Sequence, residues 1–144
     1  AKVIQGGPFK SKKGVNLPNT NVSLPALTEK DIEDAIFAIE QQVDWIALSF
    51  VRNSEDLIEL QDLIKKHSDY KLPIIANIEK PEALENIDKI IAYCDGLMVA
   101  RGDLGVEVPA AEVPLIQKNL VLKAKKARIP VIIATQMMET MIDS

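Results

Sequence analysis

The stretch "LPIIANIEKPEALENIDKIIAYCDGLMVARGD", from Leu72 to Asp103, carries the pattern that decides the fold. It begins with a short apolar run, continues with apolar residues at helical spacing, and ends with a second apolar run. Short runs of this kind are typical of strands that are covered on both faces. Pro81 stands where the first residue of a helix is expected. We therefore predict a strand, a helix and a second strand, in that order.

The same alternation continues on both sides of this stretch. Apolar runs that predict strands occur at 44–51 and 130–135, and a long helical segment precedes the second of them. Helical spacing is also found at 28–42 and in the segment that follows Ser54, with Thr28 and Ser54 as the expected N-caps. Strands that alternate with crossover helices build a parallel sheet. The sequence therefore predicts the α/β class.

Two architectures are compatible with this alternation, a doubly wound open sheet and part of a (β/α)8 TIM barrel. No Gly-rich phosphate loop follows a predicted strand, which weakens the dinucleotide-binding version of the open sheet. A complete barrel needs about 250 residues, whereas the chain has 144. If the fold is a barrel, it is a partial one. The segment before Thr28 is rich in Gly, Pro and Asn, and it resembles the tail of a separate small β element.

Composition and charge narrow the class of protein. The net charge of −4 argues against binding to nucleic acid or to a membrane surface, because both need a basic surplus. A single cysteine, Cys94, cannot form an internal disulfide, and the sequence has neither a long apolar span nor a signal-peptide pattern. We therefore expect a cytoplasmic protein in a reducing compartment.

Polar side chains stand at the carboxyl end of every predicted strand. They are Ser49 and Arg52, Asn77 and Glu79, Arg101 and Asp103, and Thr135 and Gln136. Parallel α/β folds place their chemistry at this edge of the sheet. Glu79 and Asp103 supply hard oxygen ligands of the kind that Mg²⁺ prefers. A zinc site is disfavoured because His67 is the only histidine.

We predict a loop at 101–109, and the motif "ARGDLG" at 100–105 allows two interpretations. Gly102 permits a close approach of the backbone to a ligand, and a short helical turn expected near Val108 would offer free N–H groups to an anion. A carboxylate or phosphate would then bind beside a metal ion. In the other interpretation, the glycines only make a tight turn.

Four motifs give the sequence a resemblance to a known family. They are "SKKGVNLP" at 11–18, "IIANIEKPEAL" at 74–84, "GLMVARGDLGVEVP" at 96–109 and "PVIIATQM" at 130–137. In order and spacing they are similar to the motifs of pyruvate kinase. The resemblance implies the central part of the catalytic TIM barrel, with 1–24 as the remnant of an inserted small β domain and 25–144 as partial barrel. It implies phosphoryl transfer from phosphoenolpyruvate to ADP, giving pyruvate and ATP.

The resemblance also implies roles for individual residues. Glu79 and Asp103 would hold a divalent ion, Mg²⁺ or Mn²⁺. The backbone of Gly102 and Asp103, with the hydroxyl of Thr135, would bind the substrate carboxylate. Lys13 matches a position that binds nucleotide phosphate. The family also uses K⁺, but its K⁺ ligands lie in earlier strands that this sequence lacks.

Asn77 departs from the family pattern. The family carries a lysine there, whose ammonium group lies against the transferring phosphoryl group, where positioning and charge supply most of the catalysis. Loss of one preorganised donor costs about 3 to 4 kcal/mol, and loss of a cation should cost at least as much. We therefore expect the chain to be inactive or nearly so. Ser49 and Phe50 match a strand end near the family's active site.

Two other functions are compatible with the sequence. The chain could be a non-catalytic half-barrel that self-associates, because exposed strand edges pair with other chains, and a homo-oligomer is then expected. It could also be another metal-dependent barrel that handles phosphoenolpyruvate, such as an aldolase, which would share the carboxylate pair. "ATQM" and "SKKGVNLP" argue against an aldolase.

Overall fold

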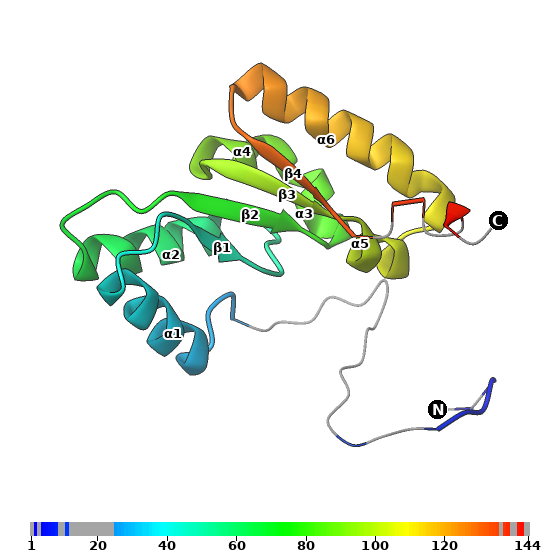
Figure 1. Ribbon diagram of the computed structural model, residues 1–144, viewed down its shortest axis with the longest axis horizontal. Coiled ribbons are helices and arrows are strands. Elements are labelled where there is room, and N and C mark those ends of the chain that lie inside the picture. The colour runs from blue at the N-terminus through cyan, green and yellow to red at the C-terminus, as the bar shows by residue number, and fades with distance from the viewer. Residues whose placement is uncertain are drawn as a thin grey trace.

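The fold is built on a parallel sheet of four strands in the order β1-β2-β3-β4 (Figure 1). The computed structural model describes residues 2, 4–8, 11, 25–135, 137–138 and 141–142. The strands are β1 (Ile46–Leu48), β2 (Ile74–Ile78), β3 (Gly96–Ala100) and β4 (Val131–Ala134). The spatial order of the strands follows the chain order, as in a segment of a (β/α) barrel. The predicted α/β class is confirmed.

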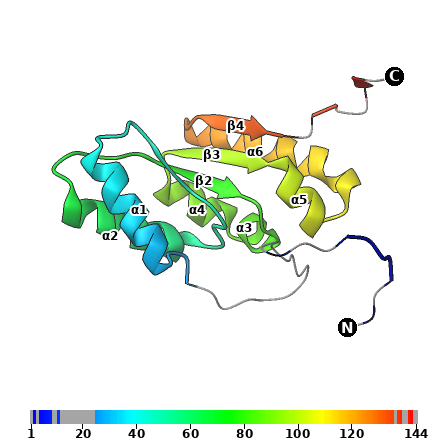
Figure 2. The same cartoon turned by 60° about the horizontal axis from the view of Figure 1, so that its bottom comes forward.

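Helices connect the strands and pack on one side of the sheet. They are α1 (Glu29–Glu40), α2 (Ser54–His67), α3 (Pro81–Glu85), α4 (Ile87–Tyr93), α5 (Arg101–Glu107) and α6 (Val113–Ala127), with a 3₁₀ turn, η1 (Ala110–Glu112), before α6. Figures 1 and 2 show α2, α4 and α6 lying along one face of the sheet, and α1 packs against α2. α3 and α5 lie at the carboxyl ends of the strands.

The core lies between the sheet and these helices. Its strand side chains, all at most 7% exposed, are Leu48, Ile74, Ala76, Ile78, Leu97 and Val99. Burial alternates along β2, where Ile75 and Asn77 are only partly buried, and Ile132 in β4 is 42% exposed. The prediction that both faces of the strands are covered holds for β3, in which every residue is buried except the partly buried Met98, but it is wrong for β1 and β4, in which Ala47 and Ile132 are exposed. The helices cover one face, and the other is more open.

Two helix starts test the predicted N-caps. Thr28 caps α1, and its hydroxyl and backbone N–H pair with Asp31 in a capping box, as the sequence predicts. The prediction for α2 is wrong by one residue, because Ser54 is already helical and Asn53 is the N-cap. Asn53 has the extended backbone that an N-cap needs, and its side-chain oxygen accepts from the backbone N–H of Asp56 at 3.1 Å.

The single helix predicted after β2 is divided into α3 and α4 at Asn86. Asn86 leaves the helical conformation, with φ −101° and ψ 9°. Its side-chain amide donates to the backbone oxygens of Arg52 at 3.2 Å and Glu82 at 3.0 Å. Asparagine side chains compete in this way with helical hydrogen bonding. The break ties the start of α4 to the loop that follows β1.

The segment after β3 is a helix, where the sequence predicts a loop. α5 begins at Arg101, directly after the strand, and Val108 caps its end. The short helical turn expected near Val108 is present two residues later as η1. Leu104 is fully buried and holds the helix against the core, which outweighs the poor helix propensity of its two glycines. Gly102 and Asp103 consequently lie in the first turn of a helix.

Candidate functional site at the carboxyl edge of the sheet

The register of the strands brings their carboxyl ends to one edge of the sheet. Leu48 pairs with Ala76 across β1 and β2, and Ala100 pairs with Ala134 across β3 and β4. The polar residues that follow the strands, among them Ser49, Glu79, Arg101 and Thr135, therefore lie along the same edge. We call this edge the carboxyl edge.

Glu79 is the buried acid of the carboxyl edge. It follows β2 directly and is 6% exposed. Burial raises the pKa of its carboxyl group, and the negative charge of Asp103 raises it further. Hydrogen bonds from the Asn77 side chain and from the Phe50 backbone lower the pKa, but they do not cancel the rise. The positive charge of Lys80 also lowers the pKa, so the net rise comes mainly from burial, and a cation bound here would favour the ionised form.

Asn77 lies beside Glu79, and only one of the two polar groups of its side-chain amide makes a hydrogen bond. Its Nδ2 group donates to the Ser49 hydroxyl at 3.3 Å, whereas its Oδ1 atom is buried with no hydrogen-bond partner. Leaving a buried acceptor unpaired costs about 1 to 3 kcal/mol. The position therefore holds a neutral group with one unused oxygen.

Gly102, Asp103 and Thr135 complete the set at this edge. The first two lie in the opening turn of α5, where backbone N–H groups have no helical partner. Asp103 is exposed. Thr135 follows β4, is exposed, and adopts a left-handed backbone with φ 58°. The N–H groups and the hydroxyl are donors that suit an anion.

Left-handed backbone occurs at two of these strand ends. Arg128 has a positive φ at the end of α6, where such a residue commonly closes a helix. Phe50, with φ 56°, and Thr135 have no such explanation, since each follows a strand. Residues held in this conformation cost about 1 to 3 kcal/mol and gather at functional sites. Their positions support a ligand site at the carboxyl edge.

One group of interacting side chains was not predicted from the sequence. Lys80 Nζ lies 2.5 Å from Glu107 Oε1 and 5.8 Å from the centre of the Phe50 ring. Glu107 is at the end of α5, and its side chain is 6% exposed. The group joins the loops after β1 and β2 to α5. The only sequence signal was that Lys80 follows the candidate ligand Glu79.

The two arginines predicted at the strand ends contact helices. Arg52 donates from its backbone N–H to Asp56 Oδ2 at 2.9 Å, and its guanidinium group pairs with the same carboxylate. Arg101 donates to the side chain of Gln117 in α6. These contacts fasten the carboxyl edge to the helices. Lys13 and Gln136, also predicted at or near the site, lie outside the described residues.

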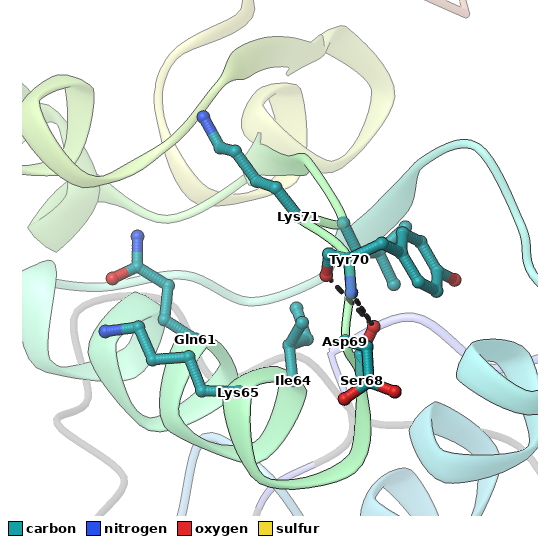
Figure 3. A pocket seen from close by; sticks show the side chains of 8 residues that line it. Gln61, Ile64, Lys65, Ser68, Asp69, Tyr70 and Lys71 are labelled. Carbon is teal, nitrogen blue, oxygen red and sulfur yellow. Dashed lines mark hydrogen bonds between the residues drawn. The ribbon is translucent and has the colours of Figure 1, made fainter.

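A pocket in the described part of the chain lies at the opposite edge of the sheet (Figure 3). Its volume is about 320 Å³, and its lining residues are Gln61, Ile64, Lys65, Ser68, Asp69, Tyr70, Lys71 and Leu72. None of the candidate site residues lines it. Among the described residues, no group of three or more His, Cys, Asp or Glu side chains is placed to hold a metal ion. At the carboxyl edge, the carboxylates of Glu79 and Asp103 are close enough for their charges to interact.

Polar groups at the carboxyl ends of parallel strands occur in doubly wound sheets and in (β/α) barrels, and the sequential strand order β1-β2-β3-β4 is that of a barrel segment. The family model for the pyruvate kinase barrel domain matches residues 1–144. The chain is 53% identical over 140 residues to the pyruvate kinase of Bacillus licheniformis, covering 97% of this chain and 24% of that protein. It is 49% identical over 141 residues to the pyruvate kinase of Clostridium perfringens, covering 98% and 30%. The chain belongs to the pyruvate kinase family.

The match concerns only part of the relatives. The chain spans 24% of the length of the proteins from Bacillus licheniformis and Geobacillus stearothermophilus and 30% of the one from Clostridium perfringens. The fold is accordingly a partial (β/α) barrel. Within the described residues, every helix is too short or too polar to cross a membrane.

Proposed function

We propose that the chain is the part of a pyruvate kinase that carries the divalent-metal and substrate-carboxylate subsites. The reaction would be phosphoryl transfer between phosphoenolpyruvate and ADP, giving pyruvate and ATP. Membership of the family supports the reaction. The observation that carries the assignment of the site is the buried Glu79, whose pKa is raised by burial and by the charge of Asp103.

Glu79 and Asp103 would hold Mg²⁺ or Mn²⁺ in this proposal. The residues fit such an ion, because Mg²⁺ in phosphoryl-transfer sites is bound by one or two carboxylates, with waters and substrate oxygens as the other ligands. Burial and the charge of Asp103 raise the pKa of Glu79, so a cation bound beside both carboxylates would stabilise the ionised form of Glu79. When bound, the ion would neutralise negative charge on the substrate.

The substrate carboxylate would bind between α5 and β4. The backbone N–H groups of Gly102 and Asp103 are in the first turn of α5, and the Thr135 hydroxyl is exposed at the end of the next strand. Three donors of this kind orient a carboxylate without requiring a charged side chain. They would fix the substrate relative to Glu79.

Further parts of the proposal concern the domain division and Lys13, which lies outside the described residues. Lys13 would contact the nucleotide phosphates, and residues 1–24 would be the remnant of the small β domain, with 25–144 as catalytic barrel. K⁺, if used, would be bound by strands outside this chain.

The 144-residue chain alone would be catalytically inactive or nearly so. Asn77 is neutral where the family's lysine would stabilise charge on the transferring group, and its Nδ2 group is already used by Ser49. Phosphoryl transfer depends on positioning and charge stabilisation. The chain would retain binding groups without this cation.

Calorimetry with Mg²⁺ and oxalate, together with a coupled assay for pyruvate formation, tests the proposal. We expect oxalate to bind only when Mg²⁺ is present, and no pyruvate above buffer in the presence of Mg²⁺ and K⁺. Thr135→Val should weaken oxalate binding, whereas Thr28→Val, which removes a hydroxyl at the far helix start, should not. Oxalate binding that needs no metal, or turnover within a hundredfold of an intact family member, would refute it.

A second candidate role is self-association through the more open face and the edges of the sheet. Ile132 is 42% exposed and Trp45 44% exposed, and β1 and β4 each have one neighbouring strand. Exposed edges of this kind pair with other chains, so we propose a homodimer or larger assembly. Sedimentation equilibrium tests it, with a concentration-independent monomer as the contrary outcome.

A further inference from the structure

Two pairs of charged residues link the end of β2 to α5. Glu79 and Lys80 are consecutive in the chain and follow β2 directly. Asp103 and Glu107 are four residues apart in α5, so their side chains lie on the same face of this helix. The charge of Asp103 acts on Glu79, and the carboxylate of Glu107 contacts Lys80. The end of β2 and α5 therefore interact through one like-charged pair and one oppositely charged pair.

The two pairs act in opposite directions on the position of α5. Burial raises the pKa of Glu79, and repulsion from the negative charge of Asp103 adds to the rise. Lys80 Nζ, in contrast, lies 2.5 Å from Glu107 Oε1. The side chains of Glu107 and Lys80 are 6% and 26% exposed, so water and salt screen their attraction less than that of an open surface pair. The ion pair thus holds α5 beside β2 against the repulsion of the two other carboxylates.

Lys80 is held in place through its backbone and its side chain. It is the N-cap of α3, and its backbone oxygen accepts from the backbone N–H of Ala83 at 3.1 Å. The following residue, Pro81, favours the extended backbone that Lys80 adopts, with φ −115° and ψ 145°. The ammonium group lies 5.8 Å from the centre of the Phe50 ring, within the range of a cation–π interaction. Lys80 is therefore a fixed point to which α5 can be attached.

The position of α5 depends on few contacts. The helix has seven residues, two of which are glycines, and no side chain caps its first turn. Helices of this length are not stable on their own. Leu104 is the one buried residue of α5, which the structure describes in full, and Arg101 donates to Gln117 in α6. The pair of Lys80 and Glu107 adds a link from the last residue of α5 to the end of β2.

We propose that Lys80, acting through Glu107, is a positioning residue for the substrate-carboxylate subsite. It holds α5 in place, and with it the free backbone N–H groups of Gly102 and Asp103, before the substrate binds. Apparent affinity falls in proportion to the fraction of molecules that are competent to bind, so a subsite that is formed in advance binds more tightly. Lys80 does this without touching the substrate. The inference rests on the proposed function, which supplies the subsite.

The test is calorimetric binding of oxalate to the 144-residue chain at saturating Mg²⁺. Lys80→Met and Glu107→Gln should each weaken oxalate binding about fivefold, because a smaller fraction of the molecules has α5 in place. Lys80→Arg keeps the cation and should bind oxalate like the parent chain. The double variant should bind no more weakly than Lys80→Met, because the two residues act as one pair.

Glu107→Gln separates positioning from a direct effect of charge. The substitution removes a negative charge near the anion subsite and frees the ammonium group of Lys80. Electrostatic attraction alone would therefore make oxalate bind more tightly to this variant. Positioning predicts weaker binding. An oxalate affinity of Glu107→Gln that equals or exceeds that of the parent chain overturns the inference.

Two controls separate positioning from a general loss of stability or charge. Asp95→Ala removes the acceptor of the Ile74 backbone N–H at the amino edge, so it lowers stability far from the subsite. Lys30→Met removes a cation from an exposed pair in α1. Both variants should bind oxalate like the parent chain. If Asp95→Ala weakens oxalate binding as much as Lys80→Met does, the effect is one of stability and the inference is overturned.

The remaining outcomes distinguish the inference from the proposed function. If the parent chain binds no oxalate in the presence of Mg²⁺, the proposed function is wrong and the inference falls with it. If the parent chain binds oxalate and Lys80→Met binds it equally well, the proposed function stands and the inference is overturned. Circular dichroism of each variant checks that it is folded. If Lys80→Met does not fold, the direction of the change in Glu107→Gln decides.

Discussion

The acidic residues at the two edges of the sheet have different surroundings. At the amino edge, Asp95 accepts from the backbone N–H of Ile74 at 3.0 Å and from Lys71 Nζ at 2.7 Å. At the carboxyl edge, Glu79 is buried with a raised pKa beside an unpaired oxygen of Asn77. Satisfied polar groups stabilise a fold, whereas local unfavourable features that persist tend to mark function. We therefore expect ligand binding at the carboxyl edge and a structural role for Asp95 at the amino edge.

Matched alanine substitutions of one acid at each edge should give the largest effects. Asp103→Ala removes one of two proposed metal ligands and should lower Mn²⁺ affinity about a hundredfold, since even indirect ligand partners are worth about 10- to 100-fold. Because Asp103 is exposed, the free energy of unfolding should barely change. Titration with Mn²⁺ and urea unfolding measure the two quantities. A large fall in the free energy of unfolding with unchanged Mn²⁺ affinity would contradict the role of Asp103 as a metal ligand.

Asp95→Ala should show the opposite behaviour. It leaves the backbone N–H of Ile74 without its acceptor, and an unpaired buried donor costs about 1 to 3 kcal/mol. We expect the urea midpoint to fall by a corresponding amount while Mn²⁺ affinity stays the same. A loss of Mn²⁺ binding in this variant would show that the two edges are not independent.

Lys80→Met should have a smaller effect on stability. The substitution keeps the aliphatic stem near Phe50 but leaves the buried carboxylate of Glu107 without its partner. The loss should be about 1 to 2 kcal/mol in the free energy of unfolding, because Lys80 itself is partly solvated. Lys30→Met removes the cation of a well-exposed pair in α1 and is the control, for which we expect almost no change. Equal losses in the two variants would contradict the structural role of Lys80.

The smallest effect should be the pH dependence that Glu79 causes. The folded-state pKa of Glu79 lies above its ordinary value of 4.5. Protonation is therefore easier in the folded state, and unfolding free energy is lost as pH rises from about 4.5 through the raised pKa. Glu79→Gln should lack this loss, so that its stability relative to the parent chain increases with pH over this interval. A difference that stays constant from pH 4 to 8 would contradict the raised pKa.

Periodicity predicted most of the fold, because strands and helices differ in the spacing of their apolar residues. α5 was missed because Gly102 and Gly105 lower helix propensity, whereas the burial of Leu104 that holds this helix is a tertiary effect. The N-cap of α2 was misplaced because Asn53 and Ser54 are both good caps and only the backbone angles distinguish them. The coverage of one face by helices also depends on packing that no single segment reveals.

Only those residues of the candidate site that follow a predicted strand could be identified from the sequence. Glu79 and Asp103 could be selected because each follows a predicted strand. Glu107 could not, since its partner Lys80 is 27 residues away in the chain. That Asn77 Oδ1 is unpaired depends on the packed structure. The Nδ2 group of Asn77 donates to Ser49, and no donor is close to Oδ1. From the sequence, the resemblance to the family predicts only that Asn77 replaces a lysine.

The most direct test of a metal site at the carboxyl edge is an anomalous-difference map from crystals of the chain grown with Mn²⁺. We predict one strong peak between the carboxylates of Glu79 and Asp103. A map with no peak at this edge, or with its strongest peak at the pocket beside Lys71, would contradict the account.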